Sequence, residues 1–221
     1  AGLMASQFAL LFARKLRVPV LITDLDQSRV DKGLAYIRGE IDKMLEKGRL
    51  SADDANQITA LVQGTTDKTR YADCDWVIEA VFEELGVKQQ VFAEIEAIVS
   101  ETAVLATNTS SLSVEEIGER LEHPERLVGF HFFNPVAVMP LIEVVKTPAT
   151  NDETLSTAMV TAAKLKKNGD FRFGMKGATS EGTWTMVDNE IVLVYKKIDG
   201  EPLEEGASGV KRIPCSFDGS A

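Results

Sequence analysis

The first residues of the chain have the types and spacing of part of a phosphate-binding turn. They read Ala-Gly-Leu-Met-Ala and lead directly into an apolar, helix-forming stretch. In the motif G-x-G-x-x-A, glycines let the backbone approach the pyrophosphate of a dinucleotide, which lies at the helix N-terminus. Gly2 would be the second glycine of that motif and Ala5 its small third residue, and the first glycine is missing. One glycine and one alanine in five residues carry little weight alone.

Asp24 strengthens this interpretation. It follows the short β-branched stretch Val18–Thr23, and in dinucleotide-binding proteins an acid about 20 residues after the glycine turn hydrogen-bonds the adenosine ribose. A carboxylate there favours NAD, because it would repel the additional phosphate of NADP. Asp24 could equally be a turn residue at a strand end or a helix cap, and its position alone does not decide between these roles.

Three segments further along carry a more specific signal. They are Asn108-Thr109-Ser110-Ser111, His131-Phe132-Phe133-Asn134-Pro135 and Met139-Pro140-Leu141-Ile142-Glu143. With Ile78-Glu79-Ala80-Val81-Phe82-Glu83-Glu84 and Val87-Lys88, their order and spacing closely resemble the NAD-binding domain of the L-3-hydroxyacyl-CoA dehydrogenase family of fatty-acid β-oxidation. The resemblance runs from residue 1 to about residue 165, and the Met-Pro-Leu-Ile-Glu form is more similar to multifunctional enzymes than to stand-alone ones.

The resemblance implies roles for particular side chains. It makes His131 the base that takes the proton from the substrate 3-hydroxyl, with Glu143 orienting the imidazole and Ser110 hydrogen-bonding the substrate oxygen. The implied cofactor contacts are Gly2, Asp24, Ala80, Glu83, Lys88, Ser110 and Asn134. The implied cofactor is NAD, the implied substrate is an acyl-CoA, and no residue is matched to a metal.

The implied chemistry is physically coherent. Oxidation of a secondary alcohol needs a base for the hydroxyl proton, and a histidine with an ordinary pKa of about 6.5 changes protonation state near neutral pH. A carboxylate behind the imidazole fixes its tautomer, and NAD accepts the hydride. Taken singly, His131 could be a strand residue, Ser110 a turn residue and Glu143 a strand-end carboxylate. The basic stretch 43–49 could meet a CoA phosphate or form a solvated helix face.

The elements that would position these residues alternate along the chain. The spacing predicts helices over 3–16, 27–47, 85–100 and 152–167, a shorter one from Ser51 and one opened by a Ser113–Glu116 capping box. It predicts strands over 18–23, 76–81, 103–106, 127–133 and 141–145. Asp26 and Gly48 are the expected start and stop of the second helix. The pattern favours a Rossmann-like, mostly parallel sheet with helices on both faces and an inserted helical hairpin.

Composition changes near Asn168–Gly169, because half of the 16 glycines follow residue 168. We therefore expect an NAD-binding domain over 1–168, truncated at its first strand, and a β-rich tail over 169–221. In the tail, 184–187 and 191–196 form an expected hairpin around Asp188-Asn189. The tail resembles no family known to us. Family members continue instead into a helical domain that closes the active site and often mediates dimerisation, so we expect little activity from this chain alone.

Composition limits the remaining possibilities. The 221 residues are 44% hydrophobic and 26% charged, which excludes wholesale disorder, and the net charge of −10 argues against nucleic acid as a partner. Neither a membrane-spanning run nor a secretion signal is expected, and Cys74 and Cys215 suggest reduced thiols. A cytoplasmic location is expected, or a mitochondrial or peroxisomal one in a eukaryote. The expected function is NAD-dependent oxidation of a (3S)-3-hydroxyacyl-CoA to a 3-ketoacyl-CoA. The alternative is a catalytically silent NAD- or acyl-CoA-binding module.

Overall fold

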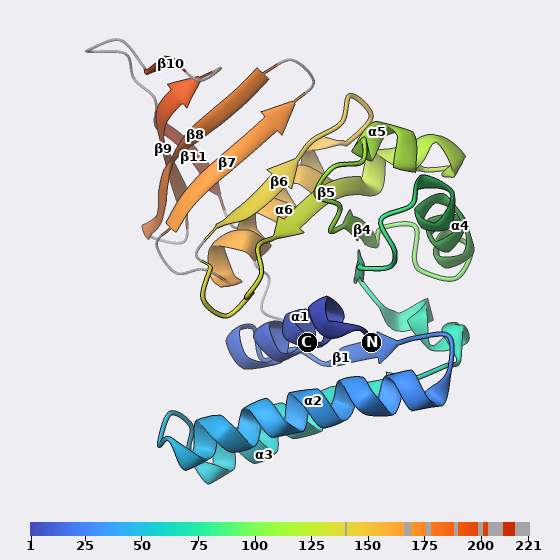
Figure 1. Cartoon of the computed structure of the whole chain (residues 1–221). Coiled ribbons are helices and arrows are strands. Elements are labelled where there is room, and N and C mark those ends of the chain that lie inside the picture. Colours follow the sequence, from blue (N-terminus) through green and yellow to red (C-terminus); the bar gives the residue numbers. More distant parts are fainter. Residues whose placement is uncertain are drawn as a thin grey trace.

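The computed structural model describes residues 1–139 and 141–165, and beyond them the backbone of strands 169–175, 178–187, 190–198, 201–202 and 210–214. It contains two sheets (Figure 1). The smaller sheet has two strands and lies against a helical hairpin, and the larger has nine strands with helices packed on it. None of the helices in the described part of the chain combines the length and the apolar character needed to cross a membrane.

The small sheet pairs β1 (Val20–Thr23) with β2 (Val62–Thr65) in parallel. Before it lies α1 (Leu3–Lys15), and between its strands lie α2 (Gln27–Glu46) and α3 (Ala52–Leu61), the expected hairpin. Asp26 caps α2 by accepting from the Arg29 N–H, and Ser51 caps α3 by accepting from the Asp54 N–H. Gly48 follows α2 with a φ of 64°, the left-handed conformation that favours glycine at a helix end.

The large sheet begins with three parallel strands, β3 (Trp76–Glu79), β4 (Val104–Thr107) and β5 (Leu127–Phe132). The next strand, β6 (Ile142–Val145), runs antiparallel to β5. The helices that accompany these strands are α4 (Leu85–Glu96), α5 (Val114–Ile117) and α6 (Asp152–Leu165), with short 3₁₀ segments at 68–73, 118–120 and 124–126.

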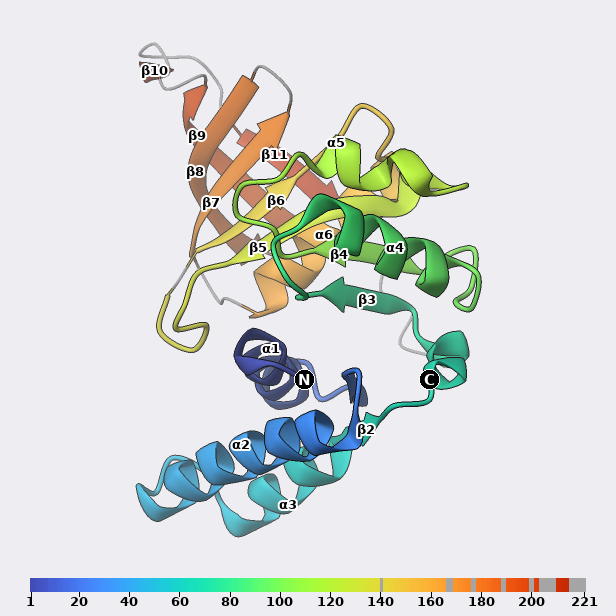
Figure 2. The same cartoon turned by 45° about the vertical axis from the view of Figure 1, so that its right-hand side comes forward.

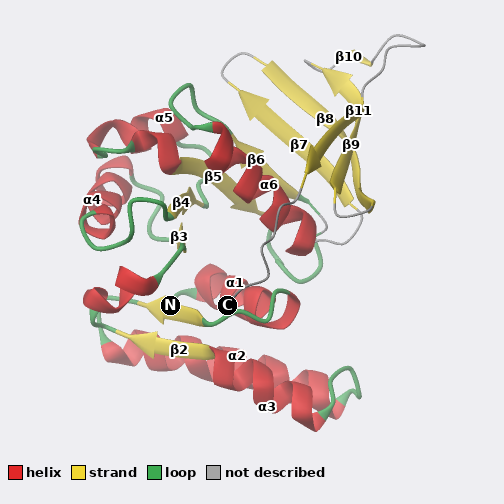
Figure 3. Cartoon of the chain, turned by 180° about the vertical axis from the view of Figure 1, so that it is seen from behind, coloured by secondary structure: helices red, strands yellow, loops and turns green. Residues whose placement is uncertain are grey.

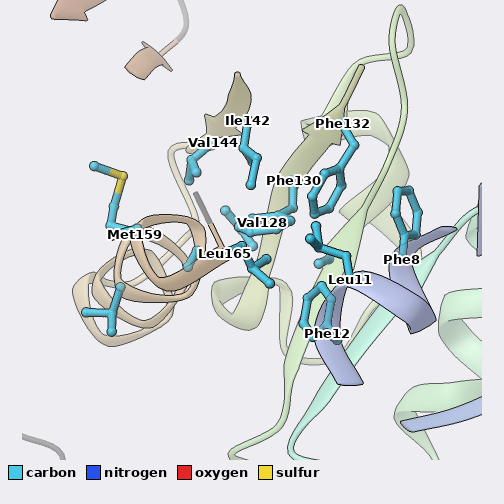
Figure 4. Packing of buried hydrophobic residues seen from close by; sticks show 14 of the residues in the cluster. Phe8, Leu11, Phe12, Val128, Phe130, Phe132, Ile142, Val144, Met159 and Leu165 are labelled. Carbon is cyan, nitrogen blue, oxygen red and sulfur yellow. The ribbon is translucent and has the colours of Figure 1, made fainter. Parts of the chain in front are cut away.

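Helices cover both faces of this sheet, which confirms the expected fold class. On one face, α1 and α6 bury apolar side chains against β5 and β6 (Figure 4); these include Phe8, Leu11, Phe12, Val128, Phe130, Phe132, Ile142, Val144, Met159 and Leu165. On the other face, α4 and α5 bury Phe92, Ile95, Val114 and Ile117 against Leu105 and Leu127. Consecutive strand side chains alternate between the two faces, so each strand contributes to both clusters.

The helix α1 connects the two sheets (Figure 2). Its residues Phe8, Leu11 and Phe12 pack into the core of the large sheet, whereas Ala9 and Ala13 pack with α2, α3 and the small sheet. Among the described residues β1 pairs with β2 and β3 pairs with β4, and no pairing joins β1 to β3. Apolar packing through α1, and not a continuous ladder of backbone hydrogen bonds, therefore holds the two parts together.

The strand β2 was not predicted from the sequence, because Val-Gln-Gly-Thr is too polar to resemble a buried strand. Gly64 shows why the segment is built this way. A Cβ atom on Gly64 would lie 2.4 Å from Cγ1 of Val30 on α2, so only glycine lets the helix approach the strand this closely. Most other boundaries differ from expectation by one or two residues, and those of β3 and α4 show why. The strand β3 ends at Glu79, whose carboxylate accepts from the Val81 N–H, and α4 ends at Glu96, short of Ser100.

The β-rich tail extends the large sheet (Figure 3). β7 (Gly169–Met175) pairs in parallel with β6, and β8 (Ala178–Val187), β9 (Glu190–Ile198), β10 (Glu201–Pro202) and β11 (Val210–Pro214) follow in antiparallel pairs. The expected hairpin is present, with Val187 opposite Glu190. Its turn residues 188–189 lie outside the described residues, as do 166–168 at the predicted end of α6. Gly169, at the predicted domain boundary, begins β7.

Candidate active site

His131 and Glu143 face one another on neighbouring antiparallel strands. They are register partners in the β5–β6 pair, and the imidazole Nδ1 lies 2.8 Å from a carboxylate oxygen of Glu143. Their side chains are only 15% and 20% exposed, so little water competes with the contact between the imidazole and the carboxylate. With Nδ1–H donating to Glu143, the imidazole is held in one tautomer, and its Nε2 can accept a proton from a substrate. The pair can thus carry out general acid–base chemistry.

Glu83, in the loop after β3, holds the loop that contains Ser110. Its carboxylate accepts from the Thr109 hydroxyl at 2.5 Å, from the Ser110 N–H at 2.9 Å and from the Ser111 N–H at 3.3 Å. Partial burial raises the pKa of Glu83, but these hydrogen bonds and the Lys88 ammonium outweigh burial and lower the pKa to about 2. Glu83 is therefore charged at neutral pH, and it fixes the loop that presents the exposed Ser110 side chain.

Lys88, on α4, lies beneath this loop. Only 1% of its side chain is exposed, and its ammonium donates to both carboxylate oxygens of Glu79 at 2.8 and 3.0 Å and lies 3.1 Å from Glu83. Glu79, which is also buried, accepts in addition from the Thr107 hydroxyl at 2.8 Å. The predicted site residue Lys88 thus sits inside an ion-pair network, and its connection to the surface passes through Glu83.

Asp24 directly follows β1 and is the acceptor for several donors. The amino group of Ala1 donates to it at 2.9 Å, the Leu25 N–H donates at 2.8 Å, and Arg29 lies at 3.5 Å. Burial raises the pKa of Asp24, but the Ala1 amino group, the Leu25 N–H and Arg29 outweigh burial and hold the pKa below its ordinary value. Asp24 is an anionic acceptor at the carboxyl end of a parallel strand, as a ribose-binding acid must be.

The N-terminus of α1 fits the phosphates of a dinucleotide. Gly2 is the N-cap residue, and no side chain caps the helix there, so the first N–H groups of α1 remain free to bind an anion. A Cβ atom on Gly2 would meet nothing within 4 Å. The space beside Gly2 is therefore open to a group from outside the chain, and these residues fit NAD as the cofactor.

The remaining predicted residues also lie at strand ends. Ala80 directly follows β3 and is partly buried against the core. Asn134 lies two residues beyond β5 and is exposed, and its side-chain oxygen accepts from the Gln7 amide at 3.1 Å. The predicted residues Asp24, Ala80 and Ser110 thus follow the carboxyl ends of β1, β3 and β4, and His131 lies near the end of β5. Ligands bind at this edge in open α/β sheets.

Three further residues belong to this arrangement although sequence reasoning assigned them no role. Asn108 accepts from the Phe132 N–H at 2.8 Å and so ties the loop after β4 to the strand that carries His131. Glu79 anchors Lys88, and Gln7 contacts Asn134. Glu79 is the one acidic residue within the apolar stretch Trp-Val-Ile-Glu-Ala-Val, a signal that could have identified it. No group of three or more His, Cys, Asp or Glu side chains that could hold a metal occurs among the described residues.

Comparison with known proteins agrees with the resemblance seen in the sequence. A profile of the family "3-hydroxyacyl-CoA dehydrogenase, NAD binding domain" matches residues 1–169. The fatty acid oxidation complex subunit alpha of Vibrio parahaemolyticus is 41% identical over 166 residues, and that of Vibrio vulnificus is 39% identical. The match covers 75% of this chain, and the chain spans 24% of the length of these curated relatives.

Solved structures give the same result. The 3-hydroxybutyryl-CoA dehydrogenase of Escherichia coli K12 superposes with a TM-score of 0.71 at 29% identity, over 77% of this chain and 35% of that one. The (S)-3-hydroxybutyryl-CoA dehydrogenase of Ralstonia eutropha superposes with a TM-score of 0.74, also at 29% identity, over 78% of this chain and 61% of that one. The fold and the family expected from the sequence are confirmed.

Proposed function

The chain belongs to the 3-hydroxyacyl-CoA dehydrogenase family, through its NAD-binding domain, and on this basis we propose that it provides the cofactor-binding and proton-transfer part of such an enzyme. The reaction is the NAD-dependent oxidation of a (3S)-3-hydroxyacyl-CoA to a 3-ketoacyl-CoA in fatty-acid β-oxidation, in the cytoplasm. We assign residues 1–168 to the NAD-binding domain and residues 169–221 to a β-rich tail, whose described strands extend the same sheet. The observation that carries the proposal is the 2.8 Å contact between His131 and Glu143 at the edge of the sheet where Asp24 and Ser110 also lie.

Each residue has a defined part in this proposal. His131 Nε2 removes the proton from the substrate 3-hydroxyl while a hydride leaves the carbon that bears this hydroxyl. Glu143 stabilises the positive charge that forms on the imidazole. Ser110 donates to the substrate oxygen from the loop that Glu83 fixes. Asn134 contacts the nicotinamide side of the cofactor, and Asp24 the adenosine ribose. NAD, when bound, supplies the hydride acceptor.

A chimeric enzyme tests the proposed function. In the alpha subunit of Vibrio parahaemolyticus, the segment that matches this chain over 166 residues is replaced by the corresponding residues of this chain. The chimera should oxidise 3-hydroxybutyryl-CoA and form NADH, followed by absorbance. A chimera that folds and binds NADH but shows no turnover would contradict the proposal and would favour a catalytically silent binding module.

The exchange Glu143→Gln should slow turnover in the chimera by about 10- to 100-fold. The glutamine oxygen can still accept from Nδ1–H of His131, but it has no charge to stabilise the imidazolium, and a hydrogen bond to a charged group is worth about 1.5–3 kcal/mol. Steady-state kinetics measure the effect. Glu125→Gln, at an exposed carboxylate beside the other histidine, is the matched control. Unchanged turnover in Glu143→Gln would show that the charge of Glu143 does not stabilise the imidazolium.

Asp24 should make the chain prefer NADH over NADPH by at least about tenfold, because a carboxylate close to the 2′-phosphate adds electrostatic repulsion. Asp24→Ala should narrow this difference in affinity, since the repelling carboxylate is gone and Arg29, 3.5 Å from Asp24, keeps only its ion pair with Asp26. Calorimetric titration of the 221-residue chain measures both affinities. Asp42→Ala, on the exposed face of α2, should leave the preference unchanged. Equal affinities in the parent chain would exclude the ribose-binding role of Asp24.

A further inference from the structure

Gln7, in the second turn of α1, links this helix to the loop after β5. Its side-chain oxygen accepts from the Val136 N–H at 2.8 Å, and its side-chain nitrogen donates to the Asn134 side-chain oxygen at 3.1 Å. Gln7 is partly buried, whereas Asn134 is exposed at the edge of the site. Both hydrogen bonds join residues far apart in the sequence, so Gln7 fixes the position of the loop relative to the helix that begins at Gly2.

The two contacts together determine which way both amides face. A backbone N–H can only donate, so the atom of Gln7 that faces Val136 must be the oxygen. The other arm of the Gln7 amide is then its NH₂ group, and the atom of Asn134 that faces this donor must also be an oxygen. The NH₂ group of Asn134 consequently lies on the arm of its amide that Gln7 does not contact. The backbone N–H of Val136 thus determines which atoms donate and which accept in the amides of Gln7 and Asn134.

We propose that Gln7 is a positioning residue that makes Asn134 a hydrogen-bond donor in the cofactor site. This inference rests on the proposed function, in which Asn134 contacts the nicotinamide. The matching group is the carbonyl oxygen of the nicotinamide carboxamide, which accepts a hydrogen bond. The two orientations of a free asparagine amide differ by a half-turn and are similar in shape, so an unrestrained Asn134 would present an acceptor part of the time. By donating to the Asn134 oxygen, Gln7 excludes the orientation in which Asn134 presents an acceptor, and it does so before the cofactor binds.

The exchange Gln7→Glu reverses the direction of the hydrogen bond between residue 7 and Asn134. One carboxylate oxygen of the glutamate still accepts from the Val136 N–H, but the other is an acceptor where the parent chain has a donor. Asn134 must then turn its NH₂ group toward the glutamate, and its oxygen points to the cofactor site. We expect NADH affinity to fall by about tenfold or more, since two acceptors then face one another. ADP-ribose carries the same two phosphates without the nicotinamide, and its affinity should change by less than about twofold.

Gln7→Ala separates positioning from simple support of the loop. It removes both hydrogen bonds but leaves Asn134 free to donate, so NADH affinity should fall less than in Gln7→Glu. If Gln7 only supported the loop, alanine would be the more damaging exchange, because glutamate keeps the bond to Val136. Gln57→Glu, on the exposed surface of α3, is the control for the added charge and should not alter NADH binding. Calorimetry of the 221-residue chain with NADH and ADP-ribose measures these affinities.

NMR of the same variants tests the orientation without any cofactor. In the parent chain, the Gln7 NH₂ protons should be close to Asn134 and exchange slowly, and the Asn134 NH₂ signals, assigned by their loss in Asn134→Asp, should exchange fast. In Gln7→Glu the Asn134 NH₂ protons should become protected while the Val136 amide keeps its protection. Asn134 signals that do not respond to Gln7→Glu would overturn the inference. A parent chain that shows the expected signals but binds no NADH would contradict the proposed function and leave the orientation of Asn134 established.

Discussion

Replacing His131 with alanine should lower the turnover of the chimeric enzyme by about 10²–10⁴-fold, the usual contribution of general acid–base catalysis. The expected cause is the loss of the group that takes the hydroxyl proton, and Glu143, the acceptor for Nδ1, loses the imidazole that it orients. NADH binding should remain nearly intact, because the cofactor contacts proposed for Asp24, Gly2 and Asn134 do not involve the ring. Acetoacetyl-CoA reduction, followed by NADH absorbance, measures the rate.

The other histidine of the chain provides the control for this exchange. His123 lies in an exposed loop, and its Nδ1 contacts Glu125 at 3.1 Å, so it too forms a histidine–carboxylate pair. Because this pair lies away from the carboxyl ends of the strands, His123→Ala should leave turnover unchanged. Turnover that survives His131→Ala would remove His131 from the mechanism, whatever the effect on NADH affinity.

Lys88→Met should destabilise the 221-residue chain by about 3–5 kcal/mol, because it leaves the buried carboxylate of Glu79 without its counter-charge. Methionine has nearly the length of lysine, so packing around α4 is preserved and the loss reports the charge. Glu83 also loses a partner, and the loop that presents Ser110 should exchange its amide hydrogens faster. Urea unfolding measures the free energy, and hydrogen exchange measures the loop.

Two further variants isolate the buried ion pair. The double exchange Glu79→Gln with Lys88→Met should recover much of the loss, since the oxygen of the neutral glutamine can still accept from the Val81 N–H while its NH₂ group donates to the Thr107 hydroxyl oxygen. Lys68→Met breaks the exposed ion pair with Glu94 and should cost less than about 1 kcal/mol. If Lys68→Met and Lys88→Met lowered the free energy of unfolding equally, the burial of the Lys88–Glu79 pair would contribute nothing to stability.

Much of the architecture could be predicted because it depends on local patterns. The helical hairpin follows from apolar spacing together with the caps at Asp26 and Ser51, and these caps form as expected. The strand β2 was not predicted because its residue types are determined by contacts with other elements of the fold and form no local pattern. Gly64 is required by the approach of Val30, and the pairing with β1 is a non-local contact that no local pattern encodes. Packing through α1, and not a shared ladder, joins the two sheets, and this also depends on the assembled fold.

The site was predictable only in part, for the same reason. His131 and Glu143 come together because two short strands pair in one register, which their motifs anticipated. The residues that support them were not singled out. Asn108 binds a backbone N–H of β5, and Gln7 reaches Asn134 across 127 positions of sequence. Such contacts are made by polar side chains that belong to no sequence pattern, and their partners are seen only in the folded structure.

The measurement that tests most directly whether the cofactor site and the His131–Glu143 pair form one active site is NMR of the imidazole nitrogens during a titration with NADH. The chain has two histidines, so His123→Ala assigns both sets of signals. We expect NADH to shift the signals of His131 and leave those of His123 unchanged, with ADP-ribose producing a much smaller shift. Saturation with NADH that leaves the His131 signals in place would contradict the proposal that this histidine lies beside the bound nicotinamide.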